Sequence, residues 1–481
     1  MHLTESASVS ASALSQSIVQ ALARSINGQV ISPEDDAYEG ARRVWNGVID
    51  KYPALIVRPR TTKEVAVAVD FARNNKLPLS VRGGGHNVAG HATNDGGMVI
   101  DLSLMKKIAV DPVNRTACAE GGVTWGELDA ATQVYGLATP GGVYSGTGIA
   151  GLTLGGGFGW LRSKHGLSAD NLIGAEVVTA NGTILHVSET KYSDVLWGLR
   201  GGGGNFGIVT KFEYKLHPVG PEVMFAFVLH DGSDPKEMKR ALRFYKEYHE
   251  TASDEVSTLL ALGQIPPTEH YPEPIHMTPF ILLAGLYAGA PAEGQRVLQP
   301  LIDFGTPLVD LSGVVPYVQA QQAFDEEYPD GLRYYWKSLN LTRFDDEAIV
   351  TIVEHARQQP SPFSTTDVWH IGGAVSKTDA RATAFYGRHA SFLVNPEANW
   401  VKPADDDANI GWARGFVDSL APFSDGSRYL NFAGFQEEGE AMMRGAFGAH
   451  YERMAELKRK YDPTNLFRLN QNVKPDGTSP E

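Results

Sequence analysis

The chain has 481 residues, with 42 basic and 56 acidic side chains and a net charge of −14. Because this excess of negative charge disfavours binding to phosphate backbones, we expect no nucleic-acid partner. The length exceeds that of one ordinary domain and favours two. With a single cysteine, the chain can form neither an internal disulfide framework nor a cysteine-based zinc site.

No targeting or membrane segment is recognised. The first residues, MHLTESASVSASALSQ, have neither a basic start nor a long apolar stretch, so we expect no signal peptide. The longest apolar segment, residues 280–292, contains Gly285 and Gly289 and is too short to cross a bilayer. We therefore expect a cytoplasmic protein that does not bind membranes.

The first half of the chain begins with a compact βαβ pattern. Residues 54–58 (ALIVR) and 77–81 (LPLSV) are predicted strands, and a helix is predicted between them at 64–73. Thr62 is a plausible N-cap for this helix. The pattern favours a small, partly parallel sheet.

A second, β-rich pattern follows. Residues 176–187 are two β-prone runs joined by Asn181 and Gly182, the strongest short hairpin signal. Cys118 lies in a predicted strand at 116–120, where we expect a small core residue. Further strands are predicted at 98–102, 108–110 and 208–216, and a helix at 125–134.

After Pro218 and Gly220 the glycine clusters stop, and longer amphipathic helices alternate with strands. The helices are predicted at 235–248, 293–302, 346–358, 404–420 and 439–461. The strands are predicted at 224–229, 257–262, 280–287, 333–338 and 368–375. We place domains at 1–220 and 221–428, and expect residues 429–481 to return to the first domain.

Glycines cluster at 83–85, 121–122, 141–159 and 201–207. Such clusters mark tight turns or a close approach of the backbone to a partner, so one shared ligand is expected; a loop-rich domain is the alternative. Gly146–Gly151 and Gly202–Gly207 both fit a dinucleotide fingerprint. Neither lies between a buried strand and a helix, which argues against a nicotinamide cofactor.

The stretch 81–87 (VRGGGHN) is more informative. Its three glycines expose backbone N–H groups that suit a pyrophosphate, with Arg82 supplying charge nearby. His86 projects from this loop, although an isolated histidine can equally be bonded to backbone. A metal site using His86 and His91 lacks a third ligand, so no metal is expected.

Five motifs occur together in order: RGGGHN at 82–87, NDGGMVIDL at 94–102, TPGGVYSGTGIAGLTLGGGFG at 139–159, LRGGGGNFGIVT at 199–210 and YDPTNLFRLNQN at 461–472. From about residue 45 onward the chain resembles the FAD-linked oxidases of the vanillyl-alcohol oxidase and p-cresol methylhydroxylase superfamily, most of all the berberine bridge enzyme-like branch. The resemblance implies an α+β fold. It consists of a two-subdomain FAD-binding domain of the p-cresol methylhydroxylase type and a substrate domain whose antiparallel sheet is covered by helices.

The resemblance also implies FAD, covalently joined through His86. Relatives that carry a second, cysteinyl link have a cysteine where this chain has Tyr144, so we expect a single link. The expected cofactor-binding residues are Arg82, Gly83, Gly84, Gly85, His86, Asn87, His91, Pro140, Gly141, Gly142, Ser145, Gly146, Thr147, Gly148, Gly151, Gly207, Ile208, Val209 and Asn472.

For catalysis, the resemblance points to Tyr429 as the base, although an anchoring role fits this residue equally well; Tyr144 and His370 are the alternatives. Strand alternation places Trp369 and His370 on opposite faces of the sheet. It does not determine which of the two faces is turned toward the flavin. The resemblance assigns Thr147 to the control of oxygen access.

The expected reaction is removal of a hydride from an alcohol, amine or activated C–H centre of a small-molecule substrate, followed by reoxidation of the flavin by O2 to hydrogen peroxide. The alternatives are a dehydrogenase with another electron acceptor, a nicotinamide-dependent reductase and a flavin-binding protein without turnover. The sequence indicates neither the substrate nor the oligomeric state.

Overall fold

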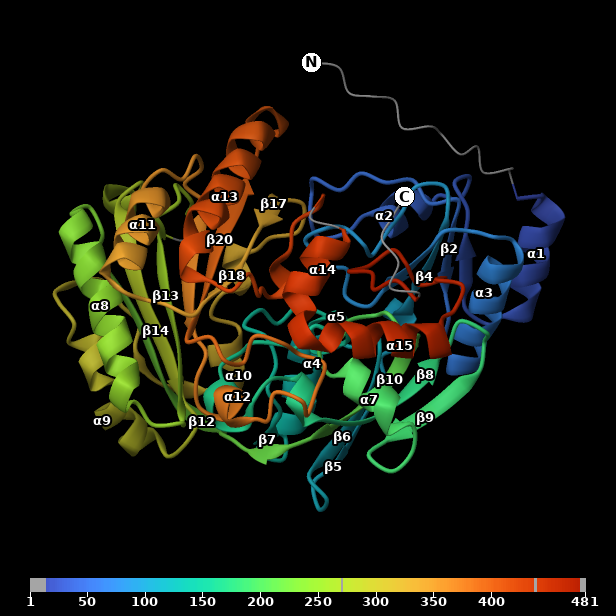
Figure 1. The fold of residues 1–481 in the computed structure, drawn as a ribbon, viewed down its shortest axis with the longest axis horizontal. Coiled ribbons are helices and arrows are strands. Elements are labelled where there is room, and N and C mark those ends of the chain that lie inside the picture. Colours follow the sequence, from blue (N-terminus) through green and yellow to red (C-terminus); the bar gives the residue numbers. More distant parts are fainter. Residues whose placement is uncertain (1–13, 270, 437–438, 476–481) are drawn as a thin grey trace.

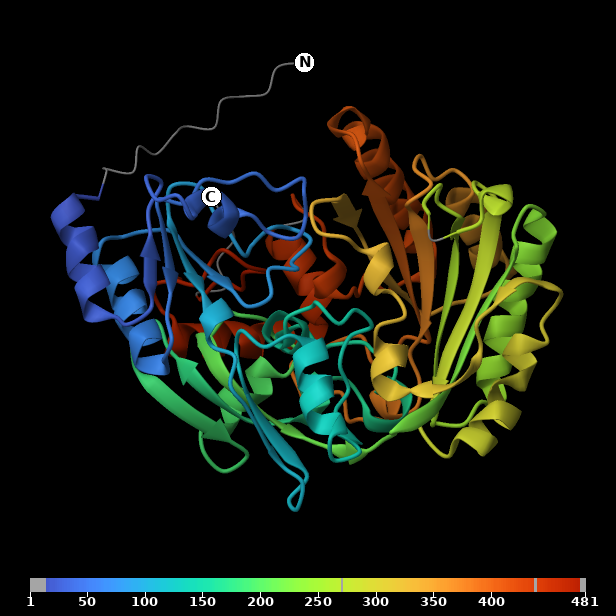
Figure 2. The ribbon, with the colours of Figure 1, turned by 180° about the vertical axis from the view of Figure 1, so that it is seen from behind.

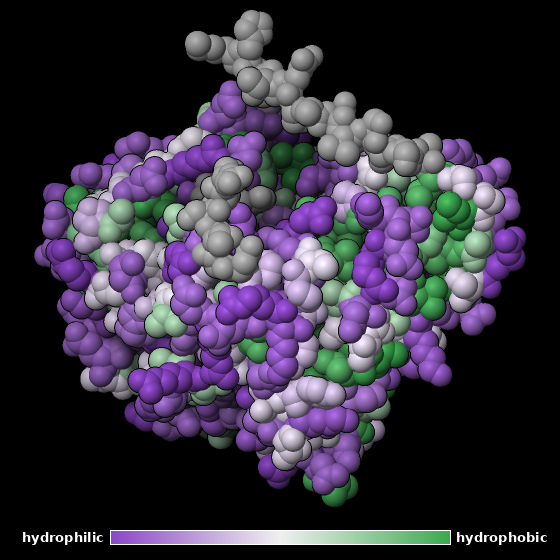
Figure 3. All heavy atoms as spheres, turned by 45° about the vertical axis from the view of Figure 1, so that its right-hand side comes forward, coloured by the Kyte–Doolittle hydropathy of each residue, from purple (hydrophilic) through white to green (hydrophobic). Residues whose placement is uncertain are grey.

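The computed structural model describes residues 14–269, 271–436 and 439–475. It has two regions side by side (Figure 1): one holds three small sheets and the glycine clusters, and the other is built on one large sheet. The predicted α+β architecture is confirmed. Among the described residues, no helix combines the length and the apolar character needed to cross a membrane. In the orientation of Figure 3, hydrophobic side chains form separate groups on a mostly hydrophilic surface.

The first small sheet has the order β1-β2-β4-β3, with bounds Gln29–Ile31, Leu55–Arg58, Met98–Asp101 and Leu79–Arg82. The predicted βαβ unit is present, but β2 and β3 are both parallel to β4, which lies between them. Helix α3 (Thr62–Asn74) buries Val65 and Val69 against this sheet. Its N-cap is Thr61, one residue before the predicted cap. The other two helices at this end are α1 (Gln16–Ser25) and α2 (Tyr38–Arg42).

The second sheet is antiparallel, in the order β5-β6-β10-β8-β9, with bounds Ile108–Asp111, Thr116–Glu120, Ile208–Lys215, Leu172–Val178 and Ile184–Ser188. The β8–β9 hairpin turns at Gly182, whose φ of +80° suits glycine. The expectation that Cys118 is a core residue is wrong: it is exposed, because strand alternation turns its neighbours Ala117 and Ala119 inward.

The segments around this sheet are short. They comprise α4 (Trp125–Gln133), α5 (Ile149–Leu154), α6 (Arg162–His165), α7 (Ser193–Leu199) and the strand pair β7 (Leu137–Ala138) and β11 (His217–Pro218). Because α5 lies within the long glycine cluster and α6 directly follows it, this part of the chain can pass close to other backbone segments.

The large sheet is antiparallel, in the order β15-β12-β14-β13-β19-β20-β17, with β16 beside β12 and β18 beside β20. Its bounds are Pro307–Asp310, Glu222–Asp231, Pro279–Tyr287, Val256–Gln264, Thr365–His370, Phe392–Trp400 and Arg333–Trp336 along this order, with β16 at Gly313–Pro316 and β18 at Leu339–Leu341. The outer face is covered by α8 (Pro235–Thr251), α9 (Pro291–Ile302), α11 (Asp346–Ala356) and α13 (Asp406–Leu420), as Figures 1 and 2 show.

The two faces of this sheet bury different side chains. Leu260 and Val368 face the helices, whereas Leu259, Trp369 and Leu393 pack with residues of the first region such as Trp160. The inner face therefore closes against the glycine-rich region. The remaining short helices, α10 (Tyr317–Gln321) and α12 (Ala374–Lys377), lie in the connections between strands.

Three details differ from the predictions. Strand β20 was not predicted, because Pro396 and its polar neighbours disguise a nine-residue strand that is buried throughout. The strand predicted at 368–375 ends at His370, and α12 follows. The single helix predicted at 439–461 is two helices, α14 (Glu440–Phe447) and α15 (Tyr451–Tyr461), broken at Gly448 with a φ of +46°.

A buried ion pair holds the C-terminal segment on the first region. The Lys458 ammonium of α15 lies 2.8 Å from the Asp462 carboxylate, and both side chains are fully buried. Lys458 also donates to the carbonyls of Asn205 and Phe467. Asp462 accepts the N–H groups of Leu466 and Phe467. These bonds fix the course of residues 466–471 beside the glycine cluster at 201–207.

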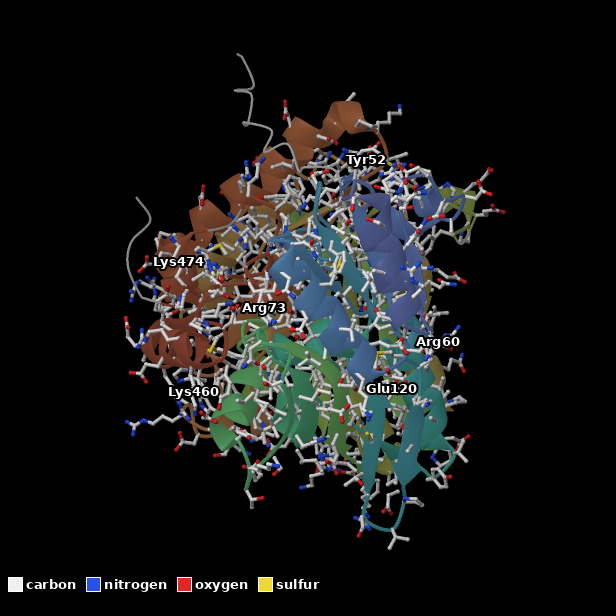
Figure 4. The ribbon with its side chains drawn as sticks, turned by 90° about the vertical axis from the view of Figure 1, so that its right-hand side faces the viewer. Tyr52, Arg60, Arg73, Glu120, Lys460 and Lys474 are labelled. Atoms are coloured by element: carbon white, nitrogen blue, oxygen red, sulfur yellow. The ribbon has the colours of Figure 1, made fainter. Side chains whose placement is uncertain are left out.

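We predict that Lys458→Met destabilises the protein by roughly 3–5 kcal/mol, because it leaves the buried Asp462 carboxylate without its cation. The control is Lys460→Met. Lys460 lies on the outer surface of α15 (Figure 4), where its pairing with Asp194 contributes little. Urea denaturation of both variants measures the difference. Equal midpoints for the two variants would show that the buried pair does not hold the segment.

Candidate functional site

A cavity lies where the glycine clusters meet the inner face of the large sheet. Its volume is about 280 Å³. It is lined by residues of the 83–87 loop, the 142–155 and 201–209 segments, strands β13, β17, β19 and β20, and residues 467–471. Segments far apart in the sequence thus form one continuous chamber, and three of the four glycine clusters contribute to it.

The floor of this chamber is bare backbone. A Cβ atom on Gly84 would lie 2.4 Å from the Gly148 nitrogen, so only glycine permits this approach. Gly85 has a φ of +77°. By contrast, a Cβ on Gly151 would meet nothing within 4 Å, which leaves an open cradle beside the two packed loops. Exposed main-chain N–H groups in such a cradle suit the diphosphate of a dinucleotide.

Most of the predicted residues line the cavity. They are Gly83, Gly84, Gly85, His86, Asn87, His91, Gly142, Tyr144, Thr147, Gly148, Gly151, Gly207, Ile208, Val209 and Tyr429. The predicted residues that do not line it are Arg82, Pro140, Gly141, Ser145, Gly146, Asn472 and His370.

The geometry explains several of these exceptions. The Arg82 guanidinium turns inward and donates to the carbonyls of Ala41 and Ala92, so its role is to hold the loop's backbone. Ser145 donates from both its N–H and its hydroxyl to the Asp325 carboxylate.

His370 lies on the wrong side of the sheet for a role at this cavity. It points to the outer face, where its ring stacks on His249 with 3.7 Å between centroids. Trp369, its neighbour in β19, faces inward and lines the cavity. The structure therefore removes His370 as a candidate base.

His86 enters the cavity between two aromatic rings, Trp45 at 5.0 Å and Tyr144 at 5.1 Å between centroids. Burial lowers the pKa of His86 to about 4, and it does the same for His91. At neutral pH the His86 imidazole is therefore uncharged and has a free nitrogen lone pair.

Tyr429 is buried and anchored. Its oxygen accepts the Gly157 N–H at 3.0 Å and the Asn431 amide at 2.8 Å. Burial raises the pKa of Tyr429 to about 12, since these two donors offset the loss of hydration only in part. The neighbouring Arg428 donates from its Nε to the Gly426 carbonyl. Tyr429 is thus a phenol at neutral pH.

Sequence reasoning missed a pair of carboxyl groups in the cavity. Asp367 of β19 and Glu397 of β20 lie on the same inner face, because Thr365 pairs with Glu397 two residues before Asp367. The Tyr328 hydroxyl donates to Glu397 at 2.8 Å. Among the described residues that line the cavity, none is a lysine or arginine.

Both carboxyl groups have raised pKa values. Burial raises the pKa of Asp367 to about 7. Burial, together with the Asp367 charge, raises the pKa of Glu397 further above its usual range. Asp367 therefore ionises first, around pH 7, while Glu397 keeps its proton.

Comparisons with known proteins agree with this site. Residues 53–188 match the FAD binding domain family, and residues 428–474 match the berberine and berberine-like family. An FAD-linked oxidoreductase of Dictyostelium discoideum is 31% identical over 464 residues, which cover 95% of this chain and 97% of the relative. The chain belongs to the berberine bridge enzyme-like FAD-linked oxidoreductases.

Two further relatives support this assignment. (R)-6-hydroxynicotine oxidase of Paenarthrobacter nicotinovorans is 30% identical over 471 residues, covering 94% of this chain and 98% of the relative. The crystal structure of 6-hydroxy-D-nicotine oxidase from Arthrobacter nicotinovorans superposes with a TM-score of 0.84 at 28% identity, covering 94% and 98% of the two chains. This FAD-linked oxidoreductase thus shares the fold of its relatives as well as their sequence.

The residues present fit FAD. The open cradle at Gly151 and the bare loops around Gly84 suit a diphosphate, and His86 borders the adjoining aromatic chamber. Among the described residues, no group of three His, Cys, Asp or Glu side chains could hold a metal ion. The carboxyl pair lies in the same chamber as His86.

We predict that Asp367→Asn makes the protein more stable at pH 8. An unfolded aspartate ionises near pH 4. Because the native state retains the proton up to a pKa of about 7, it loses stability as the pH rises between these values. The asparagine variant avoids this loss of a few kcal/mol.

Urea denaturation of both proteins from pH 4 to 8 measures the effect, with exposed Asp418→Asn as the control. Parallel stability profiles for wild type and Asp367→Asn would contradict the raised pKa.

Proposed function

We propose that this oxidoreductase carries its FAD on His86 alone, removes a proton from its substrate through the Asp367–Glu397 pair, and returns electrons to O2. The observation that carries the proposal is the shared chamber, which His86 enters from one wall and the carboxyl pair from another. The overall reaction removes two electrons and two protons from the substrate and transfers them to O2, which gives hydrogen peroxide.

A neutral, buried His86 supports covalent attachment, since only an uncharged imidazole is a nucleophile. In glucooligosaccharide oxidase of Acremonium strictum, the FAD is held by 6-S-cysteinyl and 8α-N1-histidyl links. This chain has one cysteine, Cys118, which is exposed on β6 and does not line the cavity. Tyr144 lines the chamber beside His86 and offers no thiol, which supports a single link.

We predict that the wild-type protein stays yellow after precipitation with acid, and that His86→Ala releases its flavin into the supernatant. His91→Ala is the matched control: His91 lines the same cavity from the same loop, and it should keep its flavin in the pellet. Absorbance near 450 nm in pellet and supernatant measures the bound fraction. Free flavin from the wild type would contradict the covalent link.

Bound FAD supplies the acceptor for the substrate's hydride. The chain's own part is to take the proton that leaves with it. Asp367 is the first of the pair to ionise, and the Tyr328 and Asn395 side chains that donate to Glu397 hold that carboxyl beside it. A base with a pKa near 7 is well matched to proton transfer at neutral pH. Tyr429 donates its hydroxyl hydrogen instead and positions substrate or flavin.

Reoxidation by O2 is proposed on two grounds. Relatives named above are oxidases, and Thr147, the residue expected to control oxygen access, lines the cavity with a small side chain. The walls of the chamber, with Tyr328, Trp336 and Trp369, accept a flat or ring-shaped substrate. The substrate itself stays open among alcohols, amines and activated C–H compounds.

We predict that Asp367→Asn slows anaerobic flavin reduction about 100-fold or more, because the amide cannot accept a proton. Tyr429→Phe should slow it far less, since that phenol is not ionised. A substrate found by screening for peroxide release is used for stopped-flow measurement from pH 5 to 9. The wild-type rate should rise through pH 7, as Asp367 ionises. A larger loss in Tyr429→Phe than in Asp367→Asn would return the base to Tyr429.

A further inference from the structure

Trp45 is an aromatic residue of the cavity that neither the glycine motifs nor the carboxyl pair accounts for. Its indole stacks on the His86 imidazole, with 5.0 Å between ring centroids and 23° between their planes. Its backbone N–H donates to the Gly85 carbonyl at 3.4 Å, which ties it to the glycine loop. Trp45 is buried, although it lies in a short connection after α2.

Stacking on Trp45 is the contact that orients the His86 ring. Among the residues that the structure describes, none makes a hydrogen bond to the imidazole of His86. The ring of Tyr144, on the other side, is tilted by 46° and does not stack. Contact with the Trp45 indole is therefore the interaction that sets the plane of the imidazole.

Residues of the large-sheet region contact Trp45 by stacking and by hydrogen bonds. Tyr334 of β17 stacks on the indole with 3.7 Å between centroids and 12° between planes. The indole N–H donates to the Tyr328 carbonyl at 3.0 Å. The Asn46 side chain adds bonds to the carbonyl and the N–H of Tyr334. Three rings from both regions thus form one stack, His86–Trp45–Tyr334.

We propose that Trp45, braced by Tyr334, is a positioning residue for covalent flavin attachment: it holds the His86 imidazole in the orientation from which it attacks the flavin. The inference rests on the proposed link to His86. Attachment replaces one C–H of the flavin's 8α-methyl group and the imidazole N–H by a C–N bond. The two electrons released stay on the flavin ring and pass, with two protons, to O2, which becomes hydrogen peroxide.

The test compares variants produced without flavin and then given FAD in air. The fluorescence of the protein band after denaturing electrophoresis measures covalent attachment over time, independently of activity. Trp45→Leu should slow attachment by about 10-fold or more, because a loosely held nucleophile reacts more slowly. Trp45→Phe, which keeps a stacking ring, should stay within a few-fold of wild type.

Two further comparisons separate positioning from general damage. Trp412→Leu is the matched control, since Trp412 is also buried and its indole N–H also donates to a backbone carbonyl, that of His355, but it lies on α13 under the outer face. It should attach flavin at the wild-type rate. Tyr334→Leu should slow attachment, whereas Tyr334→Phe should not.

The outcomes are distinguishable. Attachment in Trp45→Leu at the wild-type rate, with noncovalent FAD binding intact, would overturn the positioning role while leaving the His86 link in place. Equal slowing in Trp45→Leu and Trp412→Leu would also overturn it, because it would indicate loss of stability rather than of orientation. A wild type that never acquires a fluorescent band would overturn the proposed link and this inference together.

Discussion

The close approach of two glycine-containing loops is the constraint on which the cofactor site depends. A Cβ on Gly84 or Gly148 would overlap the other residue's backbone nitrogen at 2.4 Å or 2.3 Å, so neither position tolerates a side chain. This contact joins the loop after β3 to the start of α5, and it thereby sets the distance between His86 and the open cradle at Gly151. Backbone without side chains can present N–H groups to a ligand at no cost in side-chain entropy.

Burial of the carboxyl pair lowers the stability of the fold and raises the pKa of Asp367. Burying Asp367 and Glu397 side by side without a cation costs free energy that folding must supply elsewhere, and the protein limits the cost by keeping one proton on the pair. The same burial that makes ionisation expensive brings the Asp367 pKa close to neutral, where a carboxylate becomes an effective proton acceptor. Such local destabilisation is typical of functional sites.

The sequence predicted the parts of the site that depend on local patterns. Glycine spacing identified the loops, and the family resemblance pointed to His86 and Tyr429. What it could not reveal depends on pairing between distant strands. Glu397 lies in β20, where Pro396 disguises the strand, and its nearness to Asp367 follows only from the β19–β20 register. Trp45 lies before all five motifs, so no motif pointed to it. Arg82 was expected near a phosphate, but its buried guanidinium donates to backbone carbonyls instead.

The proposed flavin site therefore draws on both regions of the structure rather than on the glycine-rich region alone. The glycine-rich region contributes main chain and His86, whereas the large sheet contributes the carboxyl pair, Trp369 and the ring of Tyr334 behind Trp45. The inner face of the sheet also packs against Trp160, so a hydrophobic contact joins the two regions beside this site. A substitution anywhere in this contact can thus alter cofactor chemistry without touching the cofactor.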